Sequence, residues 1–263
     1  MEISLPSPFA EGRTAEVYEW REGYILKLYF DWCDPYWVEH EAKVAHAIIQ
    51  AGIPTPAAGE IVEVNGRRGL IYERVSGMSM LQDMNARPWM SLKHARTLAE
   101  LQAQINQLSI SGLHSYKEGL LYSIQHAPHL SDSLREKTMN LLLALKDGEK
   151  VCHGDFHPGN VLMTERGAVV IDWMTANTGN PWADVARTDL LLTVGPKGAG
   201  KQISAMVRMF IKLFYQTYMK QYLKLLPDKN NERKQWMPVI AAARLNEQIE
   251  PEREALIEMV KAG

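Results

Sequence analysis

The sequence predicts an α+β protein in which a small antiparallel sheet with one helix, residues 1–75, precedes a larger and mainly helical part, residues 76–263. Two observations indicate this class. Between residues 9 and 73, short runs rich in aromatic and β-branched residues alternate with turn sequences. After residue 77, apolar residues recur at helical spacing, interrupted only by a strand-like stretch over residues 151–173. The change of pattern near residue 76 therefore predicts the boundary between two lobes.

The N-terminal runs predict two hairpins and one helix. EVYEW and YILKLYF flank the charged turn REG, which indicates the first hairpin. In EIVEVNGRRGLIYE, the pair Asn65-Gly66 between two alternating runs favours a type I′ turn. Between the hairpins, the apolar residues of YWVEHEAKVAHAIIQAG fall at helical spacing, and Gly52 followed by Pro54 predicts the end of this helix.

The C-terminal part predicts a series of amphipathic helices. SLKHARTLAELQAQINQL places its apolar residues near one helical face, and SLREKTMNLLLALKDG begins with a capping box, Ser133 to Glu136. The runs VLM and AVVIDW flank the turn TERG and predict two short strands. The chain after Asp184 again has a helical pattern, and Pro251 suits the first turn of the last helix.

Composition excludes several classes of protein. The chain is 46% hydrophobic and 23% charged, with a net charge of -2. Without a basic excess, we expect neither nucleic acid nor a membrane surface as the main partner. Cys33 and Cys152 match no metal-ligand spacing, so we expect two buried thiols and a cytoplasmic location. No run approaches the length of a membrane span, and the N-terminus does not resemble a signal peptide.

The stretch GPKGAGKQ, residues 195–202, fits the G-x-x-x-x-G-K pattern of a phosphate-binding loop. Two features argue against that function. Gln202 stands where such a loop needs Ser or Thr to reach magnesium, and the preceding DVARTDLLLTV predicts a helix rather than a strand. We therefore interpret the stretch as a glycine-rich connection between two helices.

A second motif carries stronger chemical information. In HGDFHPGN, Asp155 and Asn160 are five residues apart, and Asp172 ends an apolar run seventeen residues after Asp155. Phosphoryl transfer needs one carboxylate that orients and deprotonates an attacking hydroxyl, and oxygen ligands that hold magnesium on the phosphates. Lys27, in an otherwise apolar strand, needs a charged partner, and Glu41 in the following helix is suitable. This pair would present Lys27 to nucleotide phosphates.

Two further segments have features of a nucleotide site. The turn EGRTAEVY, with Gly12 and Thr14 between two strands, could cover phosphates with its backbone amides. The segment LIYERVSG joins the two parts of the chain, and backbone groups at Glu73 and Val75 could bind the edge of an adenine.

These motifs resemble the aminoglycoside phosphotransferase and choline kinase group of small-molecule kinases, which share the two-lobed protein kinase fold. HGDFHPGN resembles the catalytic loop of that group, and IDW stands where protein kinases have D-F-G. GRTAEVY, YILKLYF, EHEAKVA, GIPTP, LIYERVSG and NPWADVA follow in the family's order, over residues 10–190. The resemblance implies a nucleotide-binding lobe over 1–75, a catalytic and acceptor-binding lobe over 76–263, ATP or GTP as donor, Mg²⁺, and a small-molecule hydroxyl acceptor.

The resemblance also assigns residues. It implies that Asp155 is the catalytic base, that Asp184 supports the catalytic loop through its backbone, and that His153 braces this loop. The implied magnesium ligands are Asn160 and Asp172. The implied nucleotide-binding residues are Gly12, Arg13, Thr14, Lys27, Glu41, Tyr72, Glu73 and Val75, with Tyr72 behind the adenine. The phosphate-covering turn has one glycine where many kinases have three, and IDW lacks the final glycine of D-F-G.

Four alternatives remain open at this point. His153, Asp155 and His157 alternate, and on an extended strand they would form part of a transition-metal site of a hydrolase. A catalytically silent regulator could share the fold, and the short stretch from Asp172 to Asp184 disfavours a protein kinase. The last alternative concerns the acidic C-terminal segment, which would bind a cationic acceptor or would simply form a solvated helix face. Its acidic residues are Glu247, Glu250, Glu252, Glu254 and Glu258. The sequence leaves the oligomeric state open.

Overall fold

The computed structural model describes residues 4–195, 204–228 and 230–263 of the chain, which is divided into two units. The first unit comprises Met1–Met80 and Gly159–Thr175, and the second comprises Leu81–Pro158 and Ala176–Gly263. The boundary that we predict between residues 75 and 76 lies close to the first exit of the chain from the first unit. As a domain boundary it stays a prediction. The α+β class is confirmed in the elements described below.

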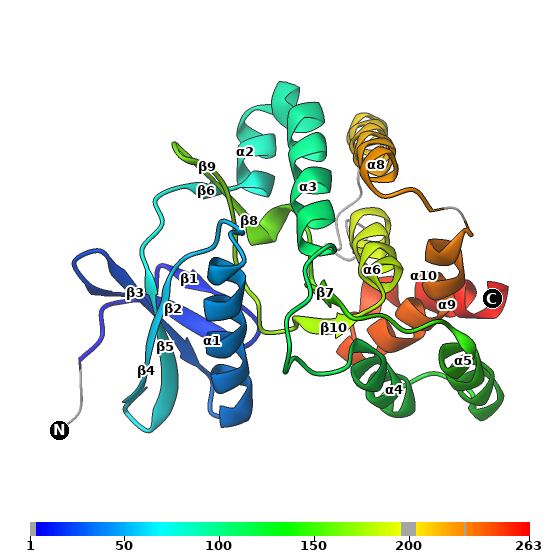
Figure 1. Cartoon of the computed structure of the whole chain (residues 1–263), viewed down its shortest axis with the longest axis horizontal. Helices are drawn as coiled ribbons and strands as arrows, with labels where there is room; N and C mark the ends of the chain where they lie inside the picture. Colours follow the sequence, from blue (N-terminus) through cyan, green and yellow to red (C-terminus); the bar gives the residue numbers. More distant parts are fainter. Residues whose placement is uncertain (1–3, 196–203, 229) are drawn as a thin grey trace. The chain divides into compact units, whose positions relative to one another are not determined.

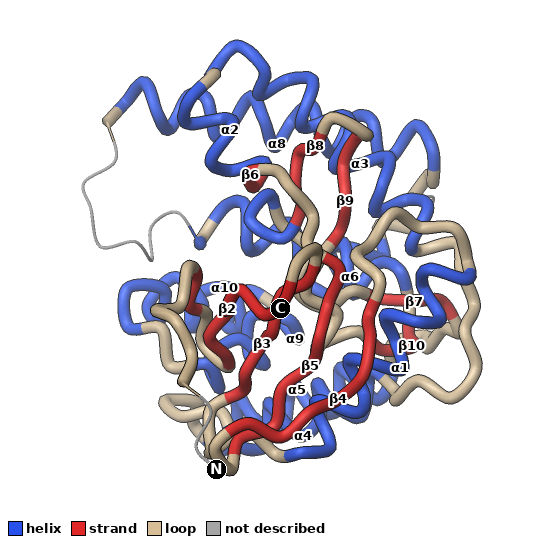
Figure 2. The backbone as a smooth tube through the Cα atoms, turned by 90° about the vertical axis from the view of Figure 1, so that its left-hand side faces the viewer, coloured by secondary structure: helices blue, strands red, loops and turns tan. Residues whose placement is uncertain are grey.

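The first unit is built on a five-stranded antiparallel sheet in the order β1-β2-β3-β5-β4 (Figures 1 and 2). The strands are β1 (Ala10–Glu11), β2 (Ala15–Arg21), β3 (Tyr24–Tyr29), β4 (Ala58–Val64) and β5 (Arg67–Glu73). Asn65 and Gly66 join β4 to β5 with φ of 51° and 82°, as the predicted type I′ turn requires. Both predicted hairpins are therefore confirmed.

Helix α1 (Pro35–Gln50) packs against β4 and β5 of this sheet (Figure 1). Asp34 caps its N-terminus by accepting a hydrogen bond from the Tyr36 backbone N–H at 2.9 Å, a contact typically worth about 1 kcal/mol. Its buried face includes Val38, Ala42 and Ala45. These residues form a core with the side chains of the sheet that face the helix. The predicted helix is thus confirmed.

A smaller sheet in the order β6-β8-β9 belongs to the same unit. It consists of β6 (Met78–Ser79), β8 (Val161–Thr164) and β9 (Gly167–Val170). Strands β8 and β9 form the predicted hairpin, with Val161 opposite Val170. Because Asn160 precedes β8 and Asp172 follows β9, both residues lie at the same end of this hairpin.

The second unit is mainly helical and contains a small sheet of β7 (Lys150–Cys152) and β10 (Asn177–Gly179). In the main hydrophobic core of this unit, helix α9 packs against α4, α5, α6 and α10. Its C-terminal half is buried on all sides, as the run Ala241, Ala242 and Ala243 allows. The helices are α2 (Met80–Ala86), α3 (Ser91–Ile105), α4 (Tyr116–His126), α5 (Asp132–Ala144), α6 (Pro181–Thr193), α8 (Ala205–Leu225), α9 (Glu232–Arg244) and α10 (Arg253–Ala262), with short 3-10 helices η1 (Pro88–Met90), η3 (Leu245–Glu247) and η4 (Glu250–Glu252). The 3-10 helix η2 (Pro158–Asn160) lies where the chain passes back from the second unit to the first.

A buried carboxylate joins α2 to α3. Asp83 accepts a hydrogen bond from Arg87 Nε at 2.7 Å, and its other oxygen lies 2.6 Å from Nε2 of the buried His94. Burial alone would raise the pKa of Asp83, but the hydrogen bonds from Arg87 and His94 outweigh it and hold this pKa below its ordinary value. The ionised form of Asp83 therefore stabilises the fold.

Two helix starts differ from the sequence prediction. Helix α5 begins before Ser133, because the hydroxyl of Ser131 accepts the Leu134 N–H and acts as the cap, so the predicted capping box is wrong. Pro251 lies in η4, and α10 begins two residues later at Arg253. The first difference arises because Ser131 rather than Ser133 caps the helix, and the second because the turn around Pro251 is a 3-10 turn that leads directly into α10.

The remaining sequence predictions for this unit concern α6 and the residues after it. DVARTDLLLTV is helical within α6, as expected. Most of GPKGAGKQ, residues 196–202, lies outside the described residues, so our interpretation of it stays a prediction. Cys33 and Cys152 are buried and not joined in a disulfide, which confirms the expected thiols. In the part of the chain that is described, no helix combines the length and apolar character of a membrane span.

Candidate active site

The predicted catalytic loop follows β7 in the second unit. Gly154 adopts φ of 79°, which a residue without a β-carbon adopts at little cost. In this conformation its backbone N–H donates to Oδ1 of Asp184 at 2.8 Å. The predicted support of the loop by Asp184 is thereby confirmed.

Asp184 is itself held by side-chain amides of α3. Its other oxygen, Oδ2, accepts hydrogen bonds from Gln102 Nε2 at 3.0 Å and from Asn106 Nδ2 at 2.9 Å. Behind these amides, the hydroxyls of Tyr218 and Tyr222 of α8 donate to the amide oxygens. The fully buried carboxylate is thus compensated by three donors, which is the condition for burying a charge.

Asp155 lies in the same loop with its side chain 31% exposed. Its Oδ2 lies 3.5 Å from His157 Nε2, and its Oδ1 lies 3.5 Å from a terminal nitrogen of Arg187 in α6. Burial alone would raise the pKa of Asp155. The hydrogen bond of His157 and the charge of Arg187 outweigh burial and hold the pKa well below its ordinary value. Asp155 is therefore a carboxylate at neutral pH and can accept a hydrogen bond from an alcohol.

The alternating triplet His153, Asp155 and His157 does not lie on an extended strand. Its residues form an irregular loop with Gly154 in the left-handed region. His153 is buried, and its Nδ1 accepts the Asp155 N–H at 3.3 Å. Among the described residues, no cluster of three or more His, Cys, Asp or Glu side chains could hold a metal. The geometry therefore does not support the hydrolase alternative.

In the first unit, Lys27 lies on the central strand β3, on the face that α1 covers. Alternation along β3 directs Leu26 and Leu28 to the opposite face. Lys27 Nζ donates to both carboxylate oxygens of Glu41, at 2.8 and 2.9 Å, and to Asp172 Oδ1 at 2.9 Å. Burial alone would lower the pKa of Lys27, but the charges of Asp172 and Glu41 raise it well above its ordinary value. The predicted Lys27 and Glu41 pair is confirmed.

Glu41 is 1% exposed and receives two further donors. The hydroxyl of Tyr29 donates to its Oε2, and that of Tyr72 donates to its Oε1 at 2.9 Å. Burial, followed by the charge of Glu41, raises the pKa of both hydroxyls well above their ordinary value, so both remain donors. The structure thus brings Tyr72 to the Lys27 and Glu41 pair, while its predicted place behind an adenine stays a prediction.

Asp172 has φ of 66°, an uncommon conformation for a residue other than glycine. The Ile171 N–H donates to the Asn160 carbonyl at 3.0 Å, so the backbone joins the two predicted metal ligands at one end of the β8-β9 hairpin. A carboxylate and an amide oxygen are the donors that Mg²⁺ prefers. The residues therefore fit the predicted magnesium site in chemistry and in location within the hairpin.

The turn between β1 and β2 contains Gly12, Arg13 and Thr14. The Gly12 N–H donates to the Ala15 carbonyl at 2.9 Å, so this amide already serves the turn. The Thr14 carbonyl accepts the Phe30 N–H at 2.9 Å. The turn is fixed by contacts within the unit, and its role in covering phosphates stays a prediction.

The segment after β5 contains Glu73 and Val75. The Glu73 N–H donates to the Ala57 carbonyl at 2.8 Å, and the Arg74 N–H donates to the Gly23 carbonyl at the same distance. An adenine contact at Glu73 would therefore use its carbonyl oxygen. The predicted role of Val75 stays a prediction.

Several site residues were missed by our sequence analysis. Tyr29 has a recognisable signal, because in strand β3 it shares a face with Lys27 two residues earlier. Gln102 and Asn106 are polar residues four apart at the buried side of α3, which also signals a role. Arg187 follows Asp184 by three residues on α6 and faces the same loop.

The acidic C-terminal segment is not simply a solvated helix face. Glu252 is buried and forms an ion pair with Arg244 at 2.8 Å. Glu247 pairs with Arg187 and Arg244 at 2.5 Å each. Glu250, Glu254 and Glu258 are exposed, as a solvated face requires. The expectation of a solvated helix face is therefore wrong for Glu247 and Glu252.

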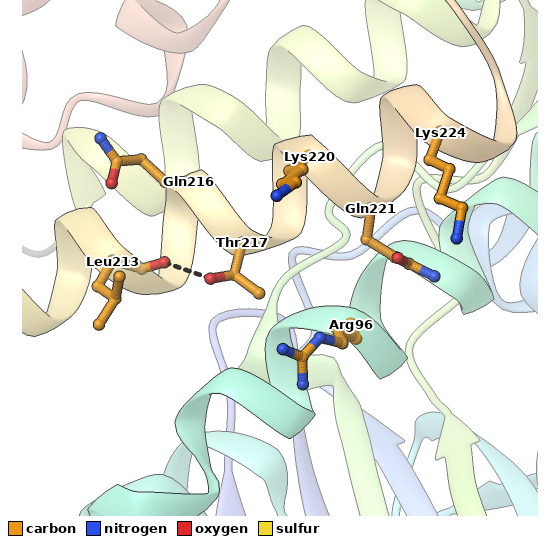
Figure 3. A pocket seen from close by; sticks show the side chains of 7 residues that line it. All are labelled: Arg96, Leu213, Gln216, Thr217, Lys220, Gln221 and Lys224. Atoms are coloured by element: carbon orange, nitrogen blue, oxygen red, sulfur yellow. Dashed lines mark hydrogen bonds between the residues drawn. The ribbon is translucent and has the colours of Figure 1, made fainter.

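A groove of about 520 Å³ lies between α3 and α8 (Figure 3). Three cationic side chains, Arg96, Lys220 and Lys224, project at its edges. The other lining residues are Leu213, Gln216, Thr217 and Gln221. None of the predicted site residues lines this groove, so we do not assign it to the candidate active site.

Comparison with protein families matches the model of the phosphotransferase enzyme family to residues 6–203. No curated protein matches the sequence at the significance required. The solved structure of an aminoglycoside-3′-phosphotransferase of type VIII is similar, with a TM-score of 0.66, 18% identity and coverage of 94% of this chain and 92% of that chain. A thermostable mutant of aminoglycoside phosphotransferase APH(4)-Ia is similar with a TM-score of 0.69 and 16% identity, and the match covers 99% of this chain and 95% of that chain. Amicoumacin kinase hAmiN, solved with AMP-PNP and Ca²⁺, is similar with a TM-score of 0.66 and 15% identity, and the match covers 97% of this chain and 86% of that chain. These matches confirm the predicted protein kinase-like fold.

Proposed function

Because the chain belongs to the phosphotransferase enzyme family, we propose that it transfers the γ-phosphate of ATP or GTP to a hydroxyl group of a small molecule, with Asp155 as the base. Family membership confirms the predicted resemblance and the predicted enzyme class, a small-molecule kinase. The donor nucleotide, the acceptor and the role of each residue are parts of the proposal.

The cluster of Lys27, Glu41 and Asp172 is the observation that carries this proposal. A lysine held by a carboxylate from a neighbouring helix is the arrangement that protein kinases use to orient nucleotide phosphates. Asn160 and Asp172 would hold Mg²⁺, which would neutralise charge on the phosphates. The turn Gly12 to Thr14 and the carbonyl of Glu73 would contact the phosphates and the base.

Asp155 would act on the acceptor. Its low pKa keeps it ionised, so it orients the acceptor hydroxyl by accepting its hydrogen bond. The hydroxyl oxygen attacks the γ-phosphorus, the bond from this phosphorus to the bridging oxygen breaks, and the nucleoside diphosphate leaves. The proton passes to the Asp155 carboxylate. A weak base suffices because the transition state of phosphoryl transfer is loose and the proton moves late.

The acceptor would be an aminoglycoside-like compound or another amino alcohol. Similar structures include APH(4)-Ia solved with AMP-PNP and hygromycin B, and amicoumacin kinase hAmiN. These names describe the similar proteins, at 17% and 15% identity, and they define the first compounds to screen. We also propose a cytoplasmic location, where the nucleotide donor is abundant.

The test combines an acceptor screen with a substitution. Release of ADP or GDP is measured with Mg²⁺ against a panel of amino alcohols and aminoglycosides, for the wild type, Asp155→Asn and the exposed control Asp132→Asn. We expect at least one acceptor to stimulate release. Asp155→Asn should lower kcat by about 10³-fold with nucleotide affinity within about twofold, and Asp132→Asn should match the wild type. Full activity of Asp155→Asn would overturn the proposed base.

A further inference from the structure

Arg187 contacts both the backbone and the carboxylate of the catalytic loop. Its Nε donates to the Gly154 carbonyl at 3.2 Å, and one terminal nitrogen lies 3.5 Å from Asp155 Oδ1. The residue is buried, at 9% exposure, so water screens its charge weakly. A single guanidinium is thus placed to fix the orientation of the Asp155 side chain relative to its own backbone.

Glu247 holds this guanidinium from a distant part of the chain. Its Oε1 lies 2.5 Å from the terminal nitrogen of Arg187 that faces Asp155, and its Oε2 is equally close to Arg244. Arg244 in turn forms two hydrogen bonds with the buried Glu252, at 2.8 and 3.1 Å. Charges of alternating sign therefore run from η4 to the catalytic loop. Residues 244–252 lie beyond residue 203, where the family match ends.

The two contacts of Arg187 are unequal, and the difference has a chemical consequence. The nitrogen is 1.0 Å closer to Glu247 than to Asp155, the difference between 2.5 and 3.5 Å. A direct ion pair with Asp155 would occupy one of its two carboxylate oxygens and weaken that oxygen as an acceptor for the substrate hydroxyl. Glu247 withholds Arg187 from such a pair, while the contact of Nε with Gly154 keeps the guanidinium beside the loop.

We propose that Arg187 is a positioning residue for Asp155. Glu247 in the C-terminal segment sets the position of Arg187, so that Arg187 orients the Asp155 carboxylate without forming a direct ion pair with it. This inference rests on the proposed function of Asp155 as the base. It gives the acidic C-terminal segment a role in the chemical step rather than in binding the acceptor.

The test separates the chemical step from binding. Glu247→Gln keeps the size of the side chain and removes its charge, so Arg187 is free to close on Asp155. We expect kcat to fall about tenfold, with the KM for the nucleotide and for the acceptor within about twofold of wild type. Arg187→Gln should lower kcat by about a hundredfold, and Arg187→Lys should recover part of this loss because the charge is retained.

Matched controls come from the junction of η4 and α10, where Glu250 and Arg253 form an exposed ion pair close in sequence to the proposed chain of charges. Glu250→Gln and Arg253→Gln should have wild-type kcat and KM. The melting temperature of every variant is measured first. If Arg187→Gln does not fold, Glu247→Gln decides the question, because Glu247 is partly exposed and its glutamine variant still offers one amide oxygen to a neighbouring arginine.

Three results would be decisive. Wild-type kcat in both Glu247→Gln and Arg187→Gln, with Asp155→Asn inactive, overturns this inference and leaves the proposed function standing. The inference is also overturned if Glu247→Gln and Glu250→Gln lose stability equally and both raise the KM for the nucleotide and for the acceptor. Such a result would indicate that Glu247 has only a structural role. Full activity of Asp155→Asn removes the proposed function itself.

Discussion

Replacing Asp184 by asparagine tests how the catalytic loop is held. The carboxylate accepts three hydrogen bonds, from Gly154 N–H at 2.8 Å, Asn106 at 2.9 Å and Gln102 at 3.0 Å. Asparagine offers one oxygen, so its amide group must face either the Gly154 N–H or the two side-chain amides. In both orientations at least one buried donor meets another donor and loses its acceptor.

The magnitude follows from these contacts. A hydrogen bond to a charged group is worth about 1.5–3 kcal/mol, and an orphaned buried donor adds a desolvation cost. We therefore expect Asp184→Asn to lower the free energy of unfolding by about 2–4 kcal/mol. Because the Gly154 backbone is then less well fixed, kcat should fall by at least about tenfold.

The assay is urea unfolding combined with steady-state kinetics, and Asp189→Asn is the control. Asp189 lies on the same helix, is also buried and pairs with Arg233 rather than with the catalytic loop. Its variant should lose stability and keep the wild-type kcat. The reasoning is refuted if Asp184→Asn unfolds within about 0.5 kcal/mol of wild type with full kcat, or if the two variants lose activity equally.

Four shorter predictions concern other sites. Glu41→Gln should raise the KM for the nucleotide about tenfold because the phosphate-orienting lysine loses its charged partner, whereas the exposed Glu39→Gln should not; equal values would contradict the pairing. Asp172→Ala should abolish the increase in nucleotide affinity on adding Mg²⁺, measured by titration with and without the metal, and a retained increase would exclude Asp172 as a ligand. The pKa of Asp83 is held below its ordinary value of 3.8, so the ionised carboxylate contributes stability above pH 3.8, and this contribution is lost as the pH falls through the lowered pKa. Urea unfolding over the acid range should therefore show a smaller decrease in the free energy of unfolding for Asp83→Asn than for wild type. Lys201→Ala should leave ATP affinity unchanged, and a large decrease would restore the phosphate-loop interpretation of GPKGAGKQ.

Features that depend on neighbouring residues could be predicted from the sequence. The type I′ turn at Asn65-Gly66 follows from backbone preferences of two residues, and α1 follows from periodicity over sixteen residues. The Lys27 and Glu41 pair is only fourteen residues apart and was predictable because a charge in an apolar strand needs a partner. The spacing within HGDFHPGN and the resemblance to a known family predicted a phosphoryl-transfer site, and the roles of its residues stay predictions.

Contacts between distant segments were decided by tertiary structure. Gln102 bonds Asp184 across 82 residues, and Arg187 bonds Glu247 across 60. Each of these residues fits a solvated or capping position equally well when only its neighbours in sequence are considered. The packing of α3, α6, α8 and α9 buries Gln102, Asp184 and Arg187, and burial of a polar group requires a partner. The sequence therefore determined which residues could perform phosphoryl transfer, while tertiary structure determined which other residues hold them in place.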